Sequence, residues 1–170
     1  ANIAQLDAGR QIAVALQDGF EGLKPLLPPP VGAGGSRRAL VLIDPSYELK
    51  SDYGKVSACI LDSLKRFPTG TYLVWYPIIP RPEAHDLPKK LKTMANKAGK
   101  SWLHATLTVK SSKLTTDEQG EVVRPGLPAS GMFLINPPHT LKAALKDALP
   151  QMVKLLGQDA NATSTLDSGG

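Results

Sequence analysis

Cysteine is nearly absent from this chain of 170 residues, which carries Cys59 alone. A single thiol excludes a disulfide framework within the chain and fits a reducing compartment. Long apolar runs are also missing, because Ala39 to Ile43 and Tyr72 to Ile79 fall far short of the ~20 residues that cross a bilayer. Residues 1–9 lack the features of a secretory signal. We therefore expect a cytoplasmic protein without a membrane segment.

The chain has no large excess of charge of one sign. It contains 20 Lys and Arg and 15 Asp and Glu, which gives a net charge of +5. Hydrophobic residues make up 42% of the chain, which excludes wholesale disorder and fibrous repeats. The modest positive charge favours a polyanionic partner without naming one. Candidate nucleic-acid contacts are the clustered residues Arg37, Arg38, Lys89, Lys90 and Lys92, with a merely solvated charged face as the alternative.

Strand and helix patterns alternate along the chain. Strands are predicted for Ile12 to Leu16, Ala39 to Ile43, Thr71 to Tyr76, Trp102 to Val109 and Met132 to Ile135. Helices are predicted for Asp18 to Leu27, from a cap at Asp52, from near Pro88, and from Thr140 with a kink or break at Pro150. Ser111 to Pro128 is interpreted as a long hairpin. This order predicts one α/β domain over 1–156, and the polar residues 157–170 predict a disordered tail.

Asp44-Pro45-Ser46-Tyr47, called the 44–47 motif below, directly follows a predicted buried strand. Ligands of such sheets bind at the carboxyl ends of the strands. Methylation of the exocyclic amine of a base needs acceptors for both amine hydrogens, because the nitrogen lone pair is delocalised into the ring. The Asp44 carboxylate and the Pro45 carbonyl would be those acceptors, and Tyr47 would stack on a flipped base. A simple strand-ending turn is the alternative.

Two further segments follow predicted strands. Asn136-Pro137-Pro138-His139 competes as an amine-holding motif, although its histidine is a poorer stacking residue and Pro-Pro can also begin a helix. In Asp18-Gly19-Phe20 the acid can accept a hydrogen bond from an adenine amine, and the glycine lets a ligand approach the backbone. Helix capping by the acid is the alternative there.

Other chemistries find no support in the sequence. The glycine-rich segment 32–35 precedes a strand, whereas a phosphate-binding loop follows one. His85, His104 and His139 are too scattered for a metal site, so no metal is expected. The serines lack a nucleophile elbow, which argues against a hydrolase, and the absence of clustered carboxylates argues against a nuclease.

The stretch from Asp18 to Thr140 resembles a family of bacterial enzymes that methylate the adenine N6 amine in large-subunit ribosomal RNA with S-adenosylmethionine. The same family is also described as involved in the use of external DNA as a nutrient. The motifs that carry the resemblance, in order, are Asp18-Gly19-Phe20, Arg37-Arg38, Leu40 to Pro45, Tyr47-Glu48, Lys65-Arg66-Phe67, Thr69-Gly70, Trp75-Tyr76-Pro77, Ala129 to Met132 and Ile135 to Pro138.

The resemblance implies a Rossmann-like fold of the kind used by S-adenosylmethionine-dependent methyltransferases. It implies that Asp44, Pro45 and Tyr47 are catalytic, and that Asp18, Gly19 and Asp44 bind the methyl donor. Large-subunit ribosomal RNA is the implied partner, and S-adenosylmethionine without a metal is the implied cofactor.

The chain also departs from the family pattern. Ser46 stands where the pattern has proline, and the excursion Ser111 to Pro128 is longer. The family's basic N-terminal segment, glycine-rich donor loop, helical insertion and ribose-binding acid have no counterpart. We therefore expect the carboxyl-terminal part of such an enzyme, nearly inactive alone and able to self-associate through an exposed sheet edge at Ile12 to Leu16.

The leading alternative is a non-catalytic nucleic-acid-binding protein linked to the use of external DNA. It would use the basic clusters and Tyr47 without methyl transfer. Salt-dependent RNA binding without saturable binding of S-adenosylmethionine would favour this alternative.

Overall fold

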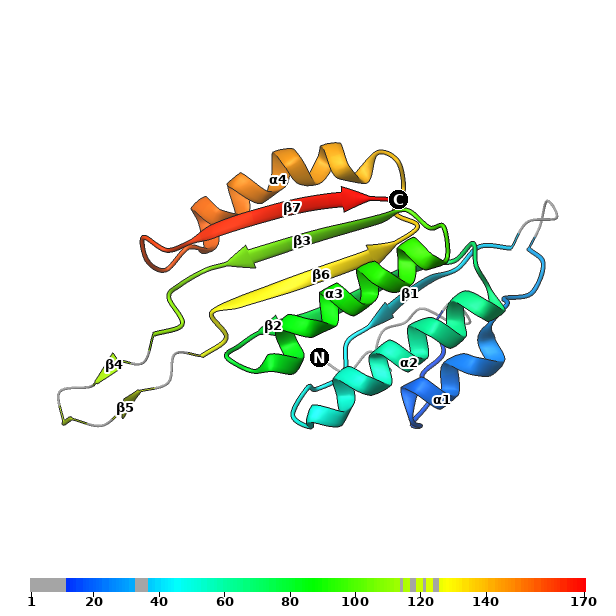
Figure 1. Cartoon of the computed structure of the whole chain (residues 1–170), viewed down its shortest axis with the longest axis horizontal. Helices are drawn as coiled ribbons and strands as arrows, with labels where there is room; N and C mark the ends of the chain where they lie inside the picture. Colours follow the sequence, from blue (N-terminus) through cyan, green and yellow to red (C-terminus); the bar gives the residue numbers. More distant parts are fainter. Residues whose placement is uncertain (1–11, 33–36, 114, 117–118, 121, 124–125) are drawn as a thin grey trace.

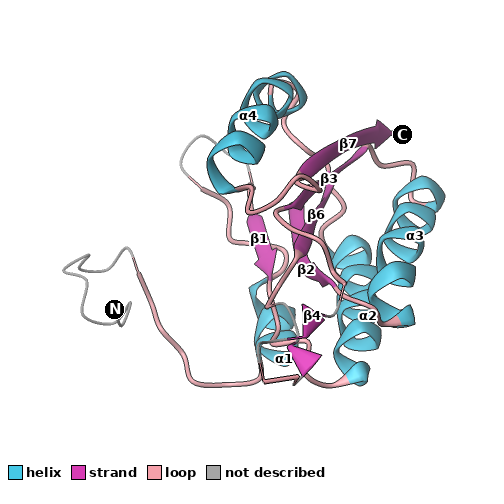
Figure 2. Ribbon diagram, turned by 90° about the vertical axis from the view of Figure 1, so that its left-hand side faces the viewer, coloured by secondary structure: helices cyan, strands magenta, loops and turns pink. Residues whose placement is uncertain are grey.

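The apolar runs of the sequence assemble into a five-stranded mixed sheet in the order β1-β2-β6-β3-β7, with helices on both faces (Figures 1 and 2). This computed structural model describes residues 12–32, 37–113, 115–116, 119–120, 122–123 and 126–170. The strands are β1 (Leu40–Ile43), β2 (Thr71–Ile78), β3 (Trp102–Thr108), β6 (Ala129–Ile135) and β7 (Thr163–Gly169). β1 and β2 are parallel, whereas the β2–β6, β6–β3 and β3–β7 pairs are antiparallel.

The helices divide between the two faces of the sheet. α2 (Lys50–Arg66) and α3 (Pro82–Lys97) cover one face, and α4 (Leu141–Leu156) covers the other (Figure 2). α2 buries Val56, Ile60 and Leu64, which recur every fourth residue and so form one helical face. The short α1 (Gly19–Leu23) continues into a 3₁₀ turn at Lys24–Leu26 and packs beside α2 (Figure 1).

The two faces bury different amounts of apolar surface. The α2 and α3 side holds the large core, with Tyr72, Tyr76 and Phe133 almost fully buried. The α4 side holds a smaller cluster of Leu103, Ala105, Leu134 and Leu149. α4 does not reach β1 on this side, where Leu40 and Leu42 are 68% and 58% exposed. The sheet is therefore open around β1.

The predicted strand at Ile12 to Leu16 is wrong. The segment pairs with no described strand, and Val14 and Leu16 are 62% and 107% exposed. Alternating apolar residues make a strand only when a neighbouring strand supplies the hydrogen bonds. The exposed edge expected at this segment is absent as well. Within the described residues, the two edge strands of the sheet are β1, which pairs with β2 alone, and β7, which pairs with β3 alone.

The predicted disordered tail at 157–170 is also wrong, because residues Thr163–Gly169 form β7. This strand pairs with the whole length of β3, from Thr163 opposite Thr108 to Gly169 opposite Trp102. Its few apolar residues suffice because an antiparallel edge strand needs only one packed side, where Leu166 joins the α4 cluster. Backbone pairing supplies the rest of the stabilisation.

Three helix predictions need smaller corrections. α3 begins at Pro82 and contains Pro88, because proline fits the first turn of a helix and the later proline removes only one hydrogen bond. α2 begins at Lys50, so Asp52 lies in its first turn and is no cap. α4 continues through Pro150, since packing around the buried Leu149 offsets the lost bond.

The long hairpin predicted between Ser111 and Pro128 is confirmed. Its two short strands are β4 (Thr115–Thr116) and β5 (Val122–Val123), an antiparallel pair that projects beyond the end of β3 (Figure 1). No helix in the described part of the chain is both long and apolar enough to cross a membrane.

Candidate active site

The 44–47 motif lies at the carboxyl end of β1, on the open side of the sheet. Ile43 is buried and ends the strand, and Asp44 follows it with an exposed side chain. Asp44 and Pro45 line a cavity of about 390 Å³ between β1 and α1. The same cavity is lined by Gly19 and Phe20 of α1 and by Cys59 of α2. Two segments that the sequence placed in one site, near residues 19 and 44, therefore meet.

Gly19 lines the cavity, and close packing does not require a glycine at this position. A Cβ atom added at this residue would meet no atom within 4 Å. The glycine is therefore not required by a close neighbour in the chain. Its bare backbone widens the cavity opposite Asp44, where a ligand could approach closely.

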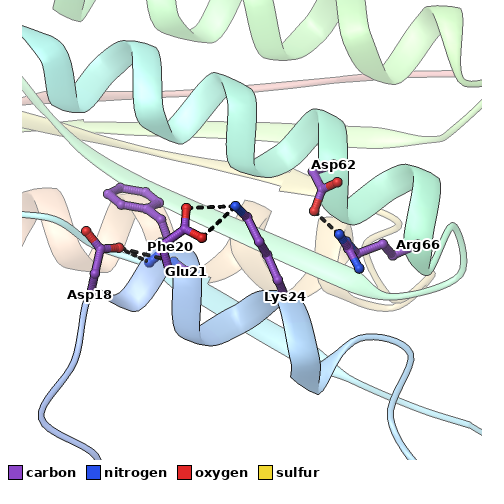
Figure 3. A network of polar contacts seen from close by, with 6 residues as sticks. All are labelled: Asp18, Phe20, Glu21, Lys24, Asp62 and Arg66. Atoms are coloured by element: carbon purple, nitrogen blue, oxygen red, sulfur yellow. Dashed lines mark hydrogen bonds and ion pairs between the residues drawn. The ribbon is translucent and has the colours of Figure 1, made fainter.

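Asp18 caps α1, which was the alternative interpretation of this residue. Its Oδ1 accepts hydrogen bonds from the backbone amides of Phe20 at 2.8 Å and Glu21 at 3.1 Å (Figure 3). Asp18 lines an adjacent cavity of about 340 Å³ and not the one at Asp44. Gly19 and Asp44 therefore line the same cavity, whereas Asp18 lines the adjacent one and caps α1.

Two ion pairs lie beside the adjacent cavity. Glu21 pairs with Lys24 at 2.7 Å on α1, and Asp62 pairs with Arg66 at 2.6 Å on α2 (Figure 3). Such exposed pairs contribute little to stability. Cys59 lines both cavities, and burial raises the pKa of its thiol, which disfavours the reactive thiolate.

The Tyr47 ring is buried, so it is not placed to stack on a base in the cavity. Its ring is 2% exposed and packs on Tyr53, with ring centroids 4.8 Å apart. Its hydroxyl donates to the backbone oxygen of Trp75 at 2.6 Å, and burial, followed by the nearby Asp44 charge, raises the pKa of this hydroxyl strongly. In this conformation Tyr47 is a core residue, because the apolar pocket beneath the turn takes up its ring.

The competing motif at Asn136 lies at the opposite end of the strands from Asp44. β6 is antiparallel to β2, so its last residue, Ile135, is paired with Tyr72 near the start of β2. The Asn136 side-chain amide donates to the backbone oxygens of Pro68 at 3.0 Å and Gly70 at 2.8 Å. Asn136 thus fastens the loop before β2, and it cannot share a site with Asp44.

The basic candidates do not gather at the cavity. Arg37 and Arg38 are exposed and precede β1, so they lie at the end of this strand away from Asp44. On α3, Lys89 pairs with Asp86 at 3.0 Å, Lys90 is exposed, and Lys92 lies 4.7 Å from the centre of the Trp102 ring. None of the five lines the cavity at Asp44. Among the described residues, no group of three His, Cys, Asp or Glu is placed to hold a metal ion.

One contact to the 44–47 motif was missed from the sequence. The Arg81 guanidinium donates from Nη1 to the backbone oxygen of Tyr47 at 3.0 Å. A lone arginine between two prolines gives no signal of such a partner, because the contact joins residues 34 positions apart in the sequence. The adjacency of the two strand ends had to be known first.

The chain is similar to proteins that are named ribosomal RNA methyltransferases. The family described as "Ribosomal RNA large subunit methyltransferase D, RlmJ" matches residues 3–167. "Ribosomal RNA large subunit methyltransferase J" of Haemophilus influenzae is 36% identical over 158 residues, which are 93% of this chain and 50% of that protein. The protein of the same name from Escherichia coli is 38% identical over 133 residues, 78% of this chain and 41% of that protein.

A solved structure gives the same picture of the fold. The crystal structure of protein LPL1258 from Legionella pneumophila superposes with a TM-score of 0.72 at 26% identity, covering 91% of this chain and 50% of that one. The chain spans about half the length of the curated relatives that it matches.

Proposed function

Because the chain belongs to the RlmJ family of large-subunit ribosomal RNA methyltransferases, we propose that its cavity at Asp44 holds an adenine N6 amine during methyl transfer from S-adenosylmethionine. The sheet is the Rossmann-like methyltransferase sheet expected from the resemblance. Large-subunit ribosomal RNA in the cytoplasm is the proposed substrate.

The observation that carries this proposal is the meeting of Gly19 and Asp44 in one cavity. The cavity volume of about 390 Å³ is within the range of small-molecule sites, roughly 300 to 1,000 Å³. Asp44 also has no hydrogen-bond or ion-pair partner among the described residues. An exposed carboxylate that the fold itself does not use is available to a substrate.

The chemistry of Asp44 and Pro45 follows from the two hydrogens of the amine. The Asp44 carboxylate accepts one hydrogen and the Pro45 carbonyl accepts the other, which favours a pyramidal nitrogen whose lone pair is no longer delocalised into the ring. S-adenosylmethionine, when bound, would supply a methyl group on a positively charged sulfur, whose S–C bond breaks during transfer and leaves a neutral thioether. As the new N–C bond forms, the nitrogen gains positive charge and loses one hydrogen as a proton. The negative charge of Asp44 stabilises that change, and its exposure lets the proton pass to water.

The donor is proposed to lie against Gly19, where the absent side chain allows close approach. Asp18 can contribute through Oδ2, since both of its capping bonds end on Oδ1. The curated relatives are about twice as long, and we propose that the part this chain does not match supplies further donor contacts. The open edge of β1 and the exposed Leu40 and Leu42 are the proposed docking surface for that part.

The test is methyl transfer to unmodified large-subunit RNA by this chain, alone and mixed with the unmatched half of the Haemophilus influenzae relative. We expect transfer by the mixture and little by the chain alone. RNA binding by the mixture without methyl transfer would support the non-catalytic nucleic-acid-binding alternative and contradict the proposal.

A further inference from the structure

Arg81 joins the loops that follow the two parallel strands β1 and β2. Its guanidinium Nη1 donates to the backbone oxygens of Tyr47 at 3.0 Å and Glu48 at 3.4 Å. Arg81 itself lies between β2 and α3, where it is the residue before the first turn of the helix. A single charged group therefore contacts two successive carbonyls of the turn that carries Asp44 and Pro45.

The backbone of Arg81 is fixed on both sides. Its amide donates to the Ile79 oxygen at 2.7 Å, and its own carbonyl accepts from the Ala84 amide at 3.1 Å at the start of α3. The side chain is half-buried beside Tyr53, where the Arg81 charge opposes the burial that raises the pKa of the Tyr53 hydroxyl. A guanidinium held in this way presents its donors in a set direction.

The turn needs such support. Tyr47 has φ of 55°, in the left-handed region that non-glycine residues enter at a cost. Ser46 does not fix its own φ as a proline would. On the core side, the turn is held by the Tyr47 ring and by the hydroxyl bond to the Trp75 oxygen at 2.6 Å. On the carbonyl side, Arg81 is the side chain that holds it.

We propose that Arg81 is a positioning residue that fixes the peptide planes of the 44–48 turn, so that the Asp44 carboxylate and the Pro45 carbonyl face the cavity together. The role in catalysis rests on the function proposed above. The restraint on the turn does not, because it concerns bonds within the chain.

The first measurement is hydrogen–deuterium exchange of the peptide covering 44–49 in the 170-residue chain. We expect Arg81→Gln to speed exchange in this peptide about tenfold, with α2 unchanged away from its first turn. Arg81→Lys, which keeps the charge but lacks the rigid planar guanidinium, should give an intermediate change. Arg66→Gln is the matched control, because Arg66 pairs with Asp62 along α2, and it should leave the peptide unchanged.

The second measurement is methyl transfer by the mixture with the unmatched half of the Haemophilus influenzae relative. Arg81→Gln should lower kcat about tenfold while the KM for S-adenosylmethionine stays within about twofold. Ser46→Pro in the Arg81→Gln background should recover part of kcat, because it restrains the same turn by another means. A merely structural arginine would instead change kcat and KM together and would not be rescued at Ser46.

The outcomes separate the two proposals. Unchanged exchange at 44–49 in both Arg81 variants would overturn the restraint on the turn, whatever the activity. Faster exchange with an unchanged kcat would overturn the positioning role. A wild-type mixture that transfers no methyl group would contradict the proposed function, and the exchange measurement would still decide whether Arg81 holds the turn.

Discussion

Two proline-containing motifs directly follow strands of the sheet, and each begins or ends on a non-glycine residue in the left-handed region. Tyr47 has φ of 55° and Asn136 has φ of 53°. The Asn136 side-chain amide donates hydrogen bonds to the backbone oxygens of Pro68 and Gly70. The Asp44 carboxylate has no partner among the described residues and faces a cavity. The two motifs therefore differ in their first polar side chain: the Asn136 amide is bonded within the fold, whereas the Asp44 carboxylate is available to a substrate.

The largest expected effect comes from Asp44→Ala in the mixture with the unmatched half of the Haemophilus influenzae relative. Loss of a preorganised group at the reacting centre should reduce methyl transfer about 10³-fold. The midpoint of urea unfolding of the chain should stay within experimental error, because the Asp44 carboxylate bonds to no residue in the described part of the chain. Activity within a few-fold of wild type would remove Asp44 from the mechanism.

Tyr47 can be tested by two substitutions that separate ring from hydroxyl. Tyr47→Ala should destabilise the chain by about 3 kcal/mol, since it empties a buried ring site, and should abolish activity. Tyr47→Phe should cost about 1 kcal/mol for the lost bond to the Trp75 oxygen and keep most activity. Urea unfolding and methyl transfer measure the two effects. If Tyr47→Phe were as inactive as Tyr47→Ala, the hydroxyl and not the ring would carry the function.

Asn136→Ala should show the reverse pattern to Asp44→Ala. The loss of two amide bonds at a left-handed residue should lower the free energy of unfolding by about 2 kcal/mol. Activity per folded molecule should stay close to wild type. Urea unfolding gives the first value, and methyl transfer below the unfolding range gives the second. A stable but inactive Asn136→Ala would reverse the assignment of the two motifs.

The smallest expected effect is the binding of S-adenosylmethionine to this chain alone, measured by calorimetry. The cavity at Asp44 lies beside β1, whose free edge no described strand covers. A donor held by one side only should bind with Kd of about 1 mM or weaker, equal to about 4 kcal/mol. Calorimetry at micromolar protein should detect no heat with S-adenosylmethionine. Tight binding by a sedimenting monomer would show that the chain contains a complete donor site.

The sequence predicted the part of the site that depends on local order. A strand followed by Asp44 and Pro45, and a glycine after an acid at Asp18, are local patterns, and the structure brings Gly19 and Asp44 into one cavity. The direction of β6 could not be read from its residues, because an apolar run looks the same in a parallel and an antiparallel strand. Because β6 is antiparallel to β2, Asn136 lies at the opposite end of the strands from Asp44.

What the sequence could not predict depends on contacts between distant segments. The polar residues of β7 become a strand only because β3 offers an edge to pair with. Tyr47 is buried because Tyr53 and Trp75 form a pocket beneath it, and Arg81 reaches the turn because β1 and β2 end side by side. The segment Ile12 to Leu16 shows the converse, since it has a strand pattern but no described partner.

The most direct measurement is the chemical position of the transferred group. Large-subunit RNA is incubated with isotope-labelled S-adenosylmethionine, this chain and the unmatched half of the Haemophilus influenzae relative, and the nucleosides are analysed by mass spectrometry. Label on the N6 amine of adenine, lost with Asp44→Ala and kept with Asn136→Ala, is the expected result. Label that persists with Asp44→Ala, or that lies on another base or ring position, would contradict the assignment of the 44–47 motif.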